Sequence, residues 1–243
     1  MAPTVEILAD KPALITRAHA LAIDTLKAAI AANGRATIAL SGGSTPKPLY
    51  QSFVNADIPW DKLFVFWGDE RYVPHDHEKS NVRMTRKAWL SHVPIPADNV
   101  FPMPTGASDP AIDAADYEET LKKFFQIADG EVPAVDFVLQ GMGDDGHTAS
   151  LFPHTPALDV RDRLITVGSQ NGDPRLTFTV PLINQGKKVV FLVSGENKQT
   201  ALSQVFSAEA DAHTYPSKFI APQQGPHWLV DAAAGAGIPD NFK

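Results

Sequence analysis

The chain of 243 residues contains no cysteine, which excludes disulfide bonds, a catalytic thiolate and thiolate metal ligands. It also has no apolar run approaching the roughly 18 residues of a membrane-spanning helix, and its first residues lack the pattern of a signal peptide. We therefore expect a cytoplasmic protein without a membrane segment. No repeat or low-complexity tract divides the chain, so a single domain over residues 1–243 is expected.

Positive charge is scarce relative to negative charge. Lys and Arg number 21 against 28 Asp and Glu, which gives a net charge of −7. Such a surface does not suit nucleic acid or an anionic membrane, so neither is expected as a partner. A local cluster of donors can still bind a small anion, and the expected partner is a small molecule. The chain itself is expected to be a monomer or a weak homodimer.

The most informative stretch is residues 135–153, where a short apolar run ends in glycines, aspartates and one histidine. Residues 135–139 have the character of a buried strand. The glycines that follow let the backbone turn sharply and approach a ligand, and they place His147 just beyond the strand end. A tight turn whose polar side chains cap backbone groups explains this stretch, taken alone, about equally well.

Three other predicted strands also end in polar segments that contain glycine and are expected to be loops. They cover residues 36–40, 63–67 and 188–193, and they run into Ser41-Gly42-Gly43-Ser44-Thr45-Pro46, Gly68-Asp69-Glu70-Arg71 and residues 194–198. The first segment has the features of an anion cradle, with Ser44 or Thr45 expected to cap a helix that has Pro46 in its first turn. It matches neither the P-loop nor the dinucleotide-binding pattern. An ordinary capped helix and a salt-bridged rim are the alternatives for the first two segments.

Helical patterns alternate with the strands. Helices are expected from Asp10 to Gly34, after Pro46, after Ser80-Asn81, over 111–128 and, for about ten residues, after Lys198. Further strands are expected over 4–9, 164–167 and 175–180 and near the C-terminus, with a loop over 168–174 and a long surface connection over 94–110. This alternation predicts a three-layer α/β fold, a Rossmann-like open and mostly parallel sheet with helices on both faces.

Ligands of such sheets bind beyond the carboxyl ends of the strands. The four polar segments should therefore meet at one edge and combine a cradle for an anion with Arg71, an imidazole and Lys198. That combination favours a phosphorylated, polar substrate such as a sugar phosphate. His75 and His77 have the spacing of a metal pair, but they lie in a loop without a third ligand, so we interpret them as surface histidines and expect no metal.

Four motifs carry a family resemblance. Ser-Gly-Gly-Ser-Thr-Pro (41–46), Gly-Asp-Glu-Arg-Tyr-Val-Pro (68–74), Ser-Asn-Val-Arg-Met (80–84) and Gly-Met-Gly-Asp-Asp-Gly-His-Thr-Ala-Ser-Leu-Phe-Pro (141–153) resemble those of the 6-phosphogluconolactonase family. Arg175-Leu-Thr-Phe-Thr and residues 191–198 look like its later motifs, so the resemblance runs in order over nearly the whole chain. One departure is Asp144, where many relatives carry an uncharged residue; it adds charge near the site.

The resemblance implies hydrolysis of 6-phospho-D-glucono-1,5-lactone to 6-phosphogluconate, the second step of the oxidative pentose phosphate pathway, without cofactor or metal. A lactone is an activated ester, so water, a base and donors for the oxyanion are sufficient. The expected catalytic residues are His147 as general base, Asp145 to orient its ring, and Arg71 to stabilise negative charge or bind the sugar. Residues two apart in the chain, such as Asp145 and His147, need not touch. The expected substrate- and phosphate-binding residues are Ser41, Gly42, Gly43, Ser44, Thr45, Asp69, Glu70, Gly146, Arg175 and Lys198.

Two alternatives belong to other functional classes. A glucosamine-6-phosphate deaminase would share the Asp-Gly-His loop, but that loop continues there into a segment with a glutamate, which residues 148–153 lack. A non-catalytic sugar-phosphate sensor usually loses the base or gains a DNA-binding domain. This chain keeps His147 and has no basic segment for DNA.

Overall fold

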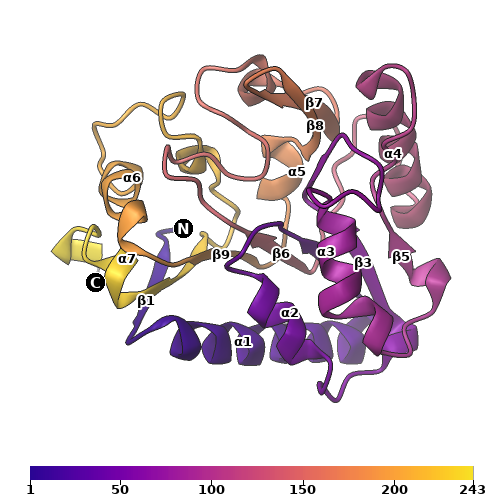
Figure 1. Ribbon diagram of the computed structural model, residues 1–243, viewed down its shortest axis with the longest axis horizontal. Helices are drawn as coiled ribbons and strands as arrows, with labels where there is room; N and C mark the ends of the chain where they lie inside the picture. The colour runs from indigo at the N-terminus through magenta and orange to yellow at the C-terminus, as the bar shows by residue number, and fades with distance from the viewer. Residues whose placement is uncertain (243) are drawn as a thin grey trace.

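A seven-stranded parallel sheet forms the centre of the computed structural model, which describes residues 1–242 (Figure 1). The strand order is β1-β10-β9-β6-β2-β3-β5. Their bounds are Thr4–Leu8 (β1), Ala36–Leu40 (β2), Leu63–Trp67 (β3), Val100–Phe101 (β5), Phe137–Gln140 (β6), Val189–Val193 (β9) and His227–Asp231 (β10). Every residue of β2, β9 and β10 is buried, because helices cover both faces of a parallel sheet.

Helices lie on both sides of this sheet (Figure 1). On one side are α1 (Lys11–Asn33), α2 (Lys47–Phe53) and α3 (Asn81–Ala88), and on the other are α4 (Pro110–Phe125), α5 (Val180–Asn184) and α6 (Gln199–Val205), while α7 (Ala232–Gly235) follows β10. The predicted three-layer, mostly parallel α/β fold is confirmed. Among residues 1–242, no helix is both long and apolar enough to span a membrane.

The ends of α1 follow the expected capping chemistry. The side chain of Asp10 accepts a hydrogen bond from the Ala13 N–H, and Gly34 ends the helix in the left-handed conformation. Between these ends the helix buries a stripe of small and aliphatic side chains: Leu14, Ala18, Ala22 and Leu26. The predicted bounds of this helix are therefore confirmed.

A second, antiparallel sheet has the order β4-β8-β7 and begins where β3 ends. Its first strand, β4 (Asp69–Arg71), follows β3 through Gly68. The N–H of Gly68 donates to the Leu40 carbonyl, 2.8 Å away, and its own carbonyl accepts a bond from the Phe178 N–H at 2.7 Å. The expectation of a polar loop over 68–71 is wrong, because pairing with the second sheet keeps this segment extended.

The other two strands of the small sheet, β7 (Ile165–Gln170) and β8 (Asp173–Phe178), form a hairpin. Its two-residue turn is Asn171-Gly172, with φ values of 54° and 87°. The expected loop over 168–174 is therefore mostly strand, and the Asn-Gly pair was the available signal, since it favours the turn of a tight hairpin.

Two other expectations fail at element boundaries. The connection over 94–110 contains β5, which pairs with the edge of β3. The helix after Lys198 has seven residues instead of about ten, because Glu196–Lys198 first form a 3-10 turn. Neither two paired residues nor a single turn is long enough to carry a periodic signal.

The carboxyl ends of β2, β3, β6 and β9 meet at one edge, as predicted. The register pairs Leu40 with Trp67 and Gln140 with Phe191, so the segments that follow these strands emerge side by side. The chain order reverses between β2 and β6, since β3 and β5 extend the sheet to one side of this pair and β9 and β10 to the other. Open α/β sheets bind ligands at such a reversal.

Candidate active site

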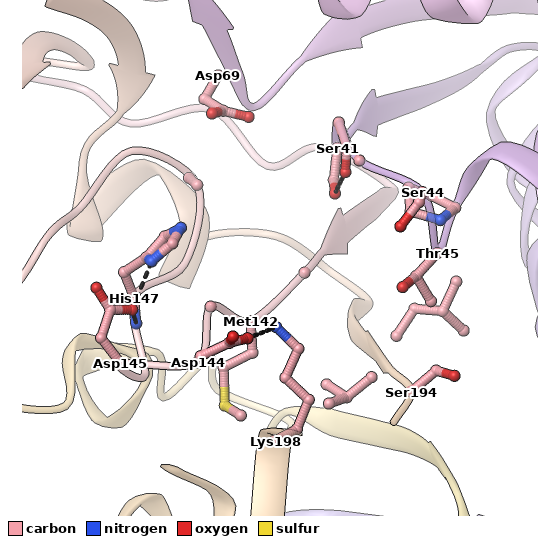
Figure 2. A pocket seen from close by; sticks show the side chains of 18 of the residues that line it. Ser41, Ser44, Thr45, Asp69, Met142, Asp144, Asp145, His147, Ser194 and Lys198 are labelled. Atoms are coloured by element: carbon pink, nitrogen blue, oxygen red, sulfur yellow. Dashed lines mark hydrogen bonds and ion pairs between the residues drawn. The ribbon is translucent and has the colours of Figure 1, made fainter. Parts of the chain in front are cut away.

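A cavity of about 510 Å³ lies at this edge of the sheet (Figure 2). Its volume is in the range of small-molecule sites, roughly 300–1,000 Å³. Most of the predicted site residues line it, namely Ser41, Gly42, Gly43, Ser44, Thr45, Asp69, Arg71, Asp145, His147, Arg175 and Lys198. The structure thus brings together side chains from four strand ends and from the small sheet.

His147 and Asp145 form a direct pair within one turn. Nδ1 of His147 lies 2.6 Å from Oδ1 of Asp145, and the backbone N–H of His147 donates to the same oxygen at 3.1 Å. Burial alone would raise the pKa of Asp145, but these hydrogen bonds from His147 outweigh it and lower that pKa. Asp145 is therefore an ionised acceptor at neutral pH, and the two residues touch.

Gly143 leaves the space that this pair occupies. A Cβ on Gly143 would lie 2.0 Å from Nδ1 of His147 and 2.6 Å from Oδ1 of Asp145. The N–H of Gly143 also donates to the His147 carbonyl at 2.8 Å. This glycine therefore allows a close approach of side chains within the loop, in addition to the sharp turn that the sequence indicated.

The His147 ring packs against Phe152, with 4.5 Å between ring centroids. Because Nδ1 faces Asp145, the other ring nitrogen, Nε2, is directed away from Asp145 and toward the cavity (Figure 2). The side chain of His147 is 22% exposed, which makes it accessible without being fully hydrated. Nε2 is therefore free to exchange a proton with a bound water or substrate.

Thr148 anchors the residue that follows the histidine. Its Oγ1 lies 2.7 Å from Oε1 of Gln140 and 2.8 Å from the Gly141 carbonyl, at the end of β6. Thr148 and Gln140 are each 1% exposed. A buried hydroxyl held in this way restricts the position of the adjacent His147 backbone.

Arg71 and Arg175 lie opposite each other on β4 and β8. Arg71 donates to the Lys79 carbonyl at 2.7 Å and Arg175 to the side chain of Gln170, while the Nε atoms of both arginines are buried without a partner among residues 1–242. In that part of the chain neither guanidinium has a carboxylate within ion-pair distance. Burial and the neighbouring Arg71 lower the pKa of Arg175. Two adjacent guanidinium groups that form no ion pair within residues 1–242 favour an anionic ligand.

The loop after β2 differs from its expected form. The helix begins at Lys47 with Pro46 at the N-cap position and no side-chain cap, so the predicted capping by Ser44 or Thr45 is wrong. These two residues form a turn instead, and their hydroxyls have no hydrogen-bond partner among the described residues. They remain available to a ligand in the cavity.

Tyr50 holds the start of this loop. Its hydroxyl donates to the Ser41 carbonyl at 2.6 Å and accepts a bond from the Ser41 N–H at 3.0 Å. Tyr50 is completely buried and Ser41 is 7% exposed, so water does not replace these bonds easily. The phenol group of Tyr50 therefore helps to hold Ser41 at the cavity wall.

Asp69 lies across the cavity from Asp145 (Figure 2). It is 6% exposed, and its Oδ2 accepts a hydrogen bond from Oγ of Ser150 at 2.7 Å. Asn81, at the start of α3, donates to the Asp69 carbonyl at 2.9 Å. The bond from Ser150 holds the Asp69 carboxylate at the cavity wall, and the bond from Asn81 holds the Asp69 backbone.

Lys198 pairs with Asp144, the residue that departs from the family pattern. Oδ1 of Asp144 contacts the Lys198 ammonium and accepts a further bond from the Asn197 amide at 2.9 Å. The pKa of Asp144 is lowered, mainly by the hydrogen bond from Lys198. Burial acts in the opposite direction but has a smaller effect. The negative charge of Asp144 is therefore paired with Lys198, the cation that was predicted to bind phosphate.

The structure does not bring Glu70 and Gly146 to the cavity. Glu70 is fully buried, and its carboxylate accepts bonds from the N–H groups of Asn81 and Val82 at 2.7 and 2.8 Å, at the start of α3. The Gly146 carbonyl accepts a bond from the Ser217 N–H at 2.9 Å, and a Cβ on Gly146 would lie 2.9 Å from the Tyr215 ring. Both residues hold the backbone around the cavity, and the expectation that they contact the substrate stays a prediction.

Within residues 1–242, no group of three or more His, Asp or Glu side chains is arranged to hold a metal ion. His77 is exposed, whereas His75 is partly buried and bonds the Met103 carbonyl at 2.8 Å through Nε2. The interpretation as a surface histidine therefore fits His77, while His75 is partly exposed and also bonded.

Comparison with known proteins agrees with the motifs. The family model described as glucosamine-6-phosphate isomerases/6-phosphogluconolactonase matches residues 9–229. The chain belongs to this family. It is 56% identical to the 6-phosphogluconolactonase of Synechocystis sp. and 58% identical to that of Nostoc sp., each over 238 residues that cover 98% of this chain and 99% of the relative. The crystal structure of 6-phosphogluconolactonase from Leishmania guyanensis is 29% identical, covers 98% of this chain and 100% of its own, and superposes with a TM-score of 0.88.

The sequence does not identify several residues of this site. Thr148 and Ser150 lie inside a quoted motif, but no local pattern shows that their hydroxyls bond Gln140 and Asp69. In the sequence, Tyr50 cannot be told apart from the other residues that form the buried face of α2. Ser194, Met142 and Gln170 line the cavity without any charge to mark them.

Proposed function

We propose that this chain hydrolyses 6-phospho-D-glucono-1,5-lactone to 6-phosphogluconate. The observation that carries the proposal is the His147–Asp145 pair in the wall of a cavity that also contains Arg71 and Arg175, neither of which forms an ion pair with the described residues 1–242. The imidazole is suited to activate water, and the cations are suited to a sugar phosphate. The two relatives at 56% and 58% identity are both named 6-phosphogluconolactonase, which supports the same reaction here.

In the proposed mechanism His147 is the general base. Nδ1–H donates to Asp145, which leaves the lone pair on Nε2. Nε2 takes a proton from water as the water oxygen bonds to C1, and the carbonyl electron pair moves to the oxygen. When this oxyanion collapses, the bond from C1 to the ring oxygen breaks and the imidazolium returns its proton to that oxygen. Asp145 stabilises the imidazolium in between.

The phosphate is proposed to bind Lys198 and the loop Ser41–Thr45, on the side of the cavity away from His147 (Figure 2). The free hydroxyls of Ser44 and Thr45 suit phosphate oxygens. Arg71 and Arg175 are proposed to contact the sugar or its oxyanion. In support, Cζ of Arg175 lies 5.1 Å from the centre of the Phe152 ring, against which His147 also packs.

The test is hydrolysis of freshly generated 6-phosphogluconolactone, coupled to 6-phosphogluconate dehydrogenase. Because this lactone also opens spontaneously, each rate is compared with a reaction that lacks the protein. Acceleration by the wild-type protein is the expected result. Folded protein that binds 6-phosphogluconate without acceleration would instead favour the sensor, and release of ammonia from glucosamine 6-phosphate would favour the deaminase.

The cellular setting is part of the same proposal. We propose that the protein acts in the cytoplasm as a monomer or weak homodimer. Sedimentation at several protein concentrations tests the oligomeric state. A stable higher oligomer at low concentration would contradict it.

A further inference from the structure

Lys198 is not an open cation in this cavity. Its ammonium contacts Oδ1 of Asp144, and within residues 1–242 no other acid lies within ion-pair distance of it. The neighbouring Asn197 donates to the same oxygen at 2.9 Å, so one carboxylate oxygen receives two donors from one loop. A phosphate that binds Lys198 must therefore compete with an internal anion.

The two partners differ in their exposure. The Lys198 side chain is 17% exposed, whereas the Asp144 side chain is 64% exposed. If the pair separates, the Asp144 carboxylate can turn into water and be fully hydrated, while the ammonium stays at the cavity wall. An ion pair with one mostly exposed partner is weaker than a fully buried one, and a phosphate dianion is a stronger partner for an ammonium group.

Asp144 also sets the charge of the cavity. Three acids, Asp69, Asp144 and Asp145, line it together with three permanent cations, Arg71, Arg175 and Lys198. Counted with neutral His147, the lining has no net charge. Removal of the Asp144 charge would leave an excess of one positive charge beside the cavity loop that carries free hydroxyls.

We propose that Asp144 is an internal counter-ion that competes with phosphate for Lys198 and so weakens the binding of phosphorylated ligands, including the product. The proposal rests on the function proposed above. When the phosphate binds, Lys198 exchanges the Asp144 oxygen for a phosphate oxygen; when the product leaves, Asp144 takes its place again. The exchange favours release of 6-phosphogluconate, since the cation is never left without a partner.

The decisive variant is Asp144→Asn, which keeps the size of the side chain and removes its charge. Isothermal titration calorimetry with 6-phosphogluconate and with inorganic phosphate should give dissociation constants about fivefold lower or more, because the ion pair no longer opposes the ligand. Gluconate, which has no phosphate, should bind equally to both proteins. Equal or weaker binding of 6-phosphogluconate by the variant would overturn the proposal.

Glu196→Gln is the matched control. Glu196 is an exposed acid in the same loop, two residues before Lys198, and forms no ion pair among residues 1–242. The variant removes the same charge without freeing Lys198, so it should change the dissociation constant much less than Asp144→Asn. An equal gain in both variants would show a general charge effect and would contradict the role of the specific pair.

A double variant separates this inference from the function on which it rests. In a Lys198→Met background the gain from Asp144→Asn should disappear, and a gain that persists would refute the competition. If the wild-type protein hydrolyses the lactone but Asp144→Asn binds product no more tightly, only the counter-ion fails. If the wild-type protein neither hydrolyses the lactone nor binds 6-phosphogluconate, the proposed function fails and the inference fails with it.

Discussion

Nδ1 of His147 lies 2.6 Å from Oδ1 of Asp145, although the two residues are separated by a single glycine. The same oxygen accepts the backbone N–H of His147, so the carboxylate is held by the loop that carries its partner. This geometry assigns the proton of the neutral ring to Nδ1 and the lone pair to Nε2. The pair is therefore both an orienting contact and the basis of the proposed proton transfer.

We predict that His147→Ala lowers kcat by about 10²–10⁴-fold, the contribution typical of a general base. The fold should persist, because the ring is partly exposed and its loop is held by Thr148 and Gly143. The measurement is the coupled lactone assay corrected for spontaneous opening, with circular dichroism as the control for folding. A variant with near-normal kcat would rule out His147 as the base.

The lowered pKa of Asp145 predicts how stability depends on pH. Because its pKa in the folded state lies below that of the unfolded chain, the unfolded state binds more protons at acidic pH. The stabilisation is fully present above the unfolded pKa, about 4, and is lost as pH falls through the folded pKa. Urea unfolding of wild-type protein and Asp145→Asn should thus differ most at pH 5–7, and the difference should shrink below about pH 4. A difference that grows toward acidic pH would contradict this assignment.

Most of the parallel core could be predicted from the sequence, because β2, β3, β6 and β9 are short, mostly apolar runs followed within two residues by a glycine. Residues 36–40 and 63–67 were predicted with their observed bounds. The small sheet was not predicted as such, since β4 is three polar residues that become a strand only through pairing with β8. Pairing between segments about a hundred residues apart leaves no periodic signal in either one.

The site shows the same division between local and long-range information. The motifs located His147, Lys198 and the loop after β2, because glycine and charged residues mark strand ends. They did not predict that Asp69 lines the cavity while its neighbour Glu70 bonds the N-terminus of α3. Alternation along β4 turns adjacent side chains to opposite faces, and a segment expected to be a loop gives no reason to look for this alternation.

The anchoring of Thr148 predicts a positioning effect on catalysis. Thr148→Val keeps the shape of the side chain and removes the hydroxyl that bonds Gln140 and Gly141. We expect kcat to fall by about tenfold or more, since small displacements of a catalytic group are costly, while KM changes little. Thr179→Val is the matched control: its buried hydroxyl bonds the carbonyls of Arg163 and Leu164, outside the cavity lining. Equal losses of kcat in both variants would indicate general destabilisation instead.

The contact between Tyr50 and Ser41 predicts an effect on substrate binding. Tyr50→Phe removes the hydroxyl that bonds both the N–H and the carbonyl of Ser41, at a site that water does not reach. The loss of these buried bonds should lower the free energy of unfolding by about 1–3 kcal/mol. It should also raise KM for the phosphorylated lactone severalfold, because the proposed phosphate loop begins at Ser41, with a smaller change in kcat.

Tyr117→Phe distinguishes this effect on the loop from simple loss of stability. Tyr117 is 1% exposed, and its hydroxyl donates to the Phe101 carbonyl at 2.8 Å, away from the cavity. Both variants lose a buried phenol hydroxyl, so their unfolding free energies, measured in urea, should fall by similar amounts. Only Tyr50→Phe should raise KM, because only its hydroxyl holds a residue that lines the cavity. If KM rises equally in both, or in neither, the loop after β2 does not bind the phosphate in the way proposed.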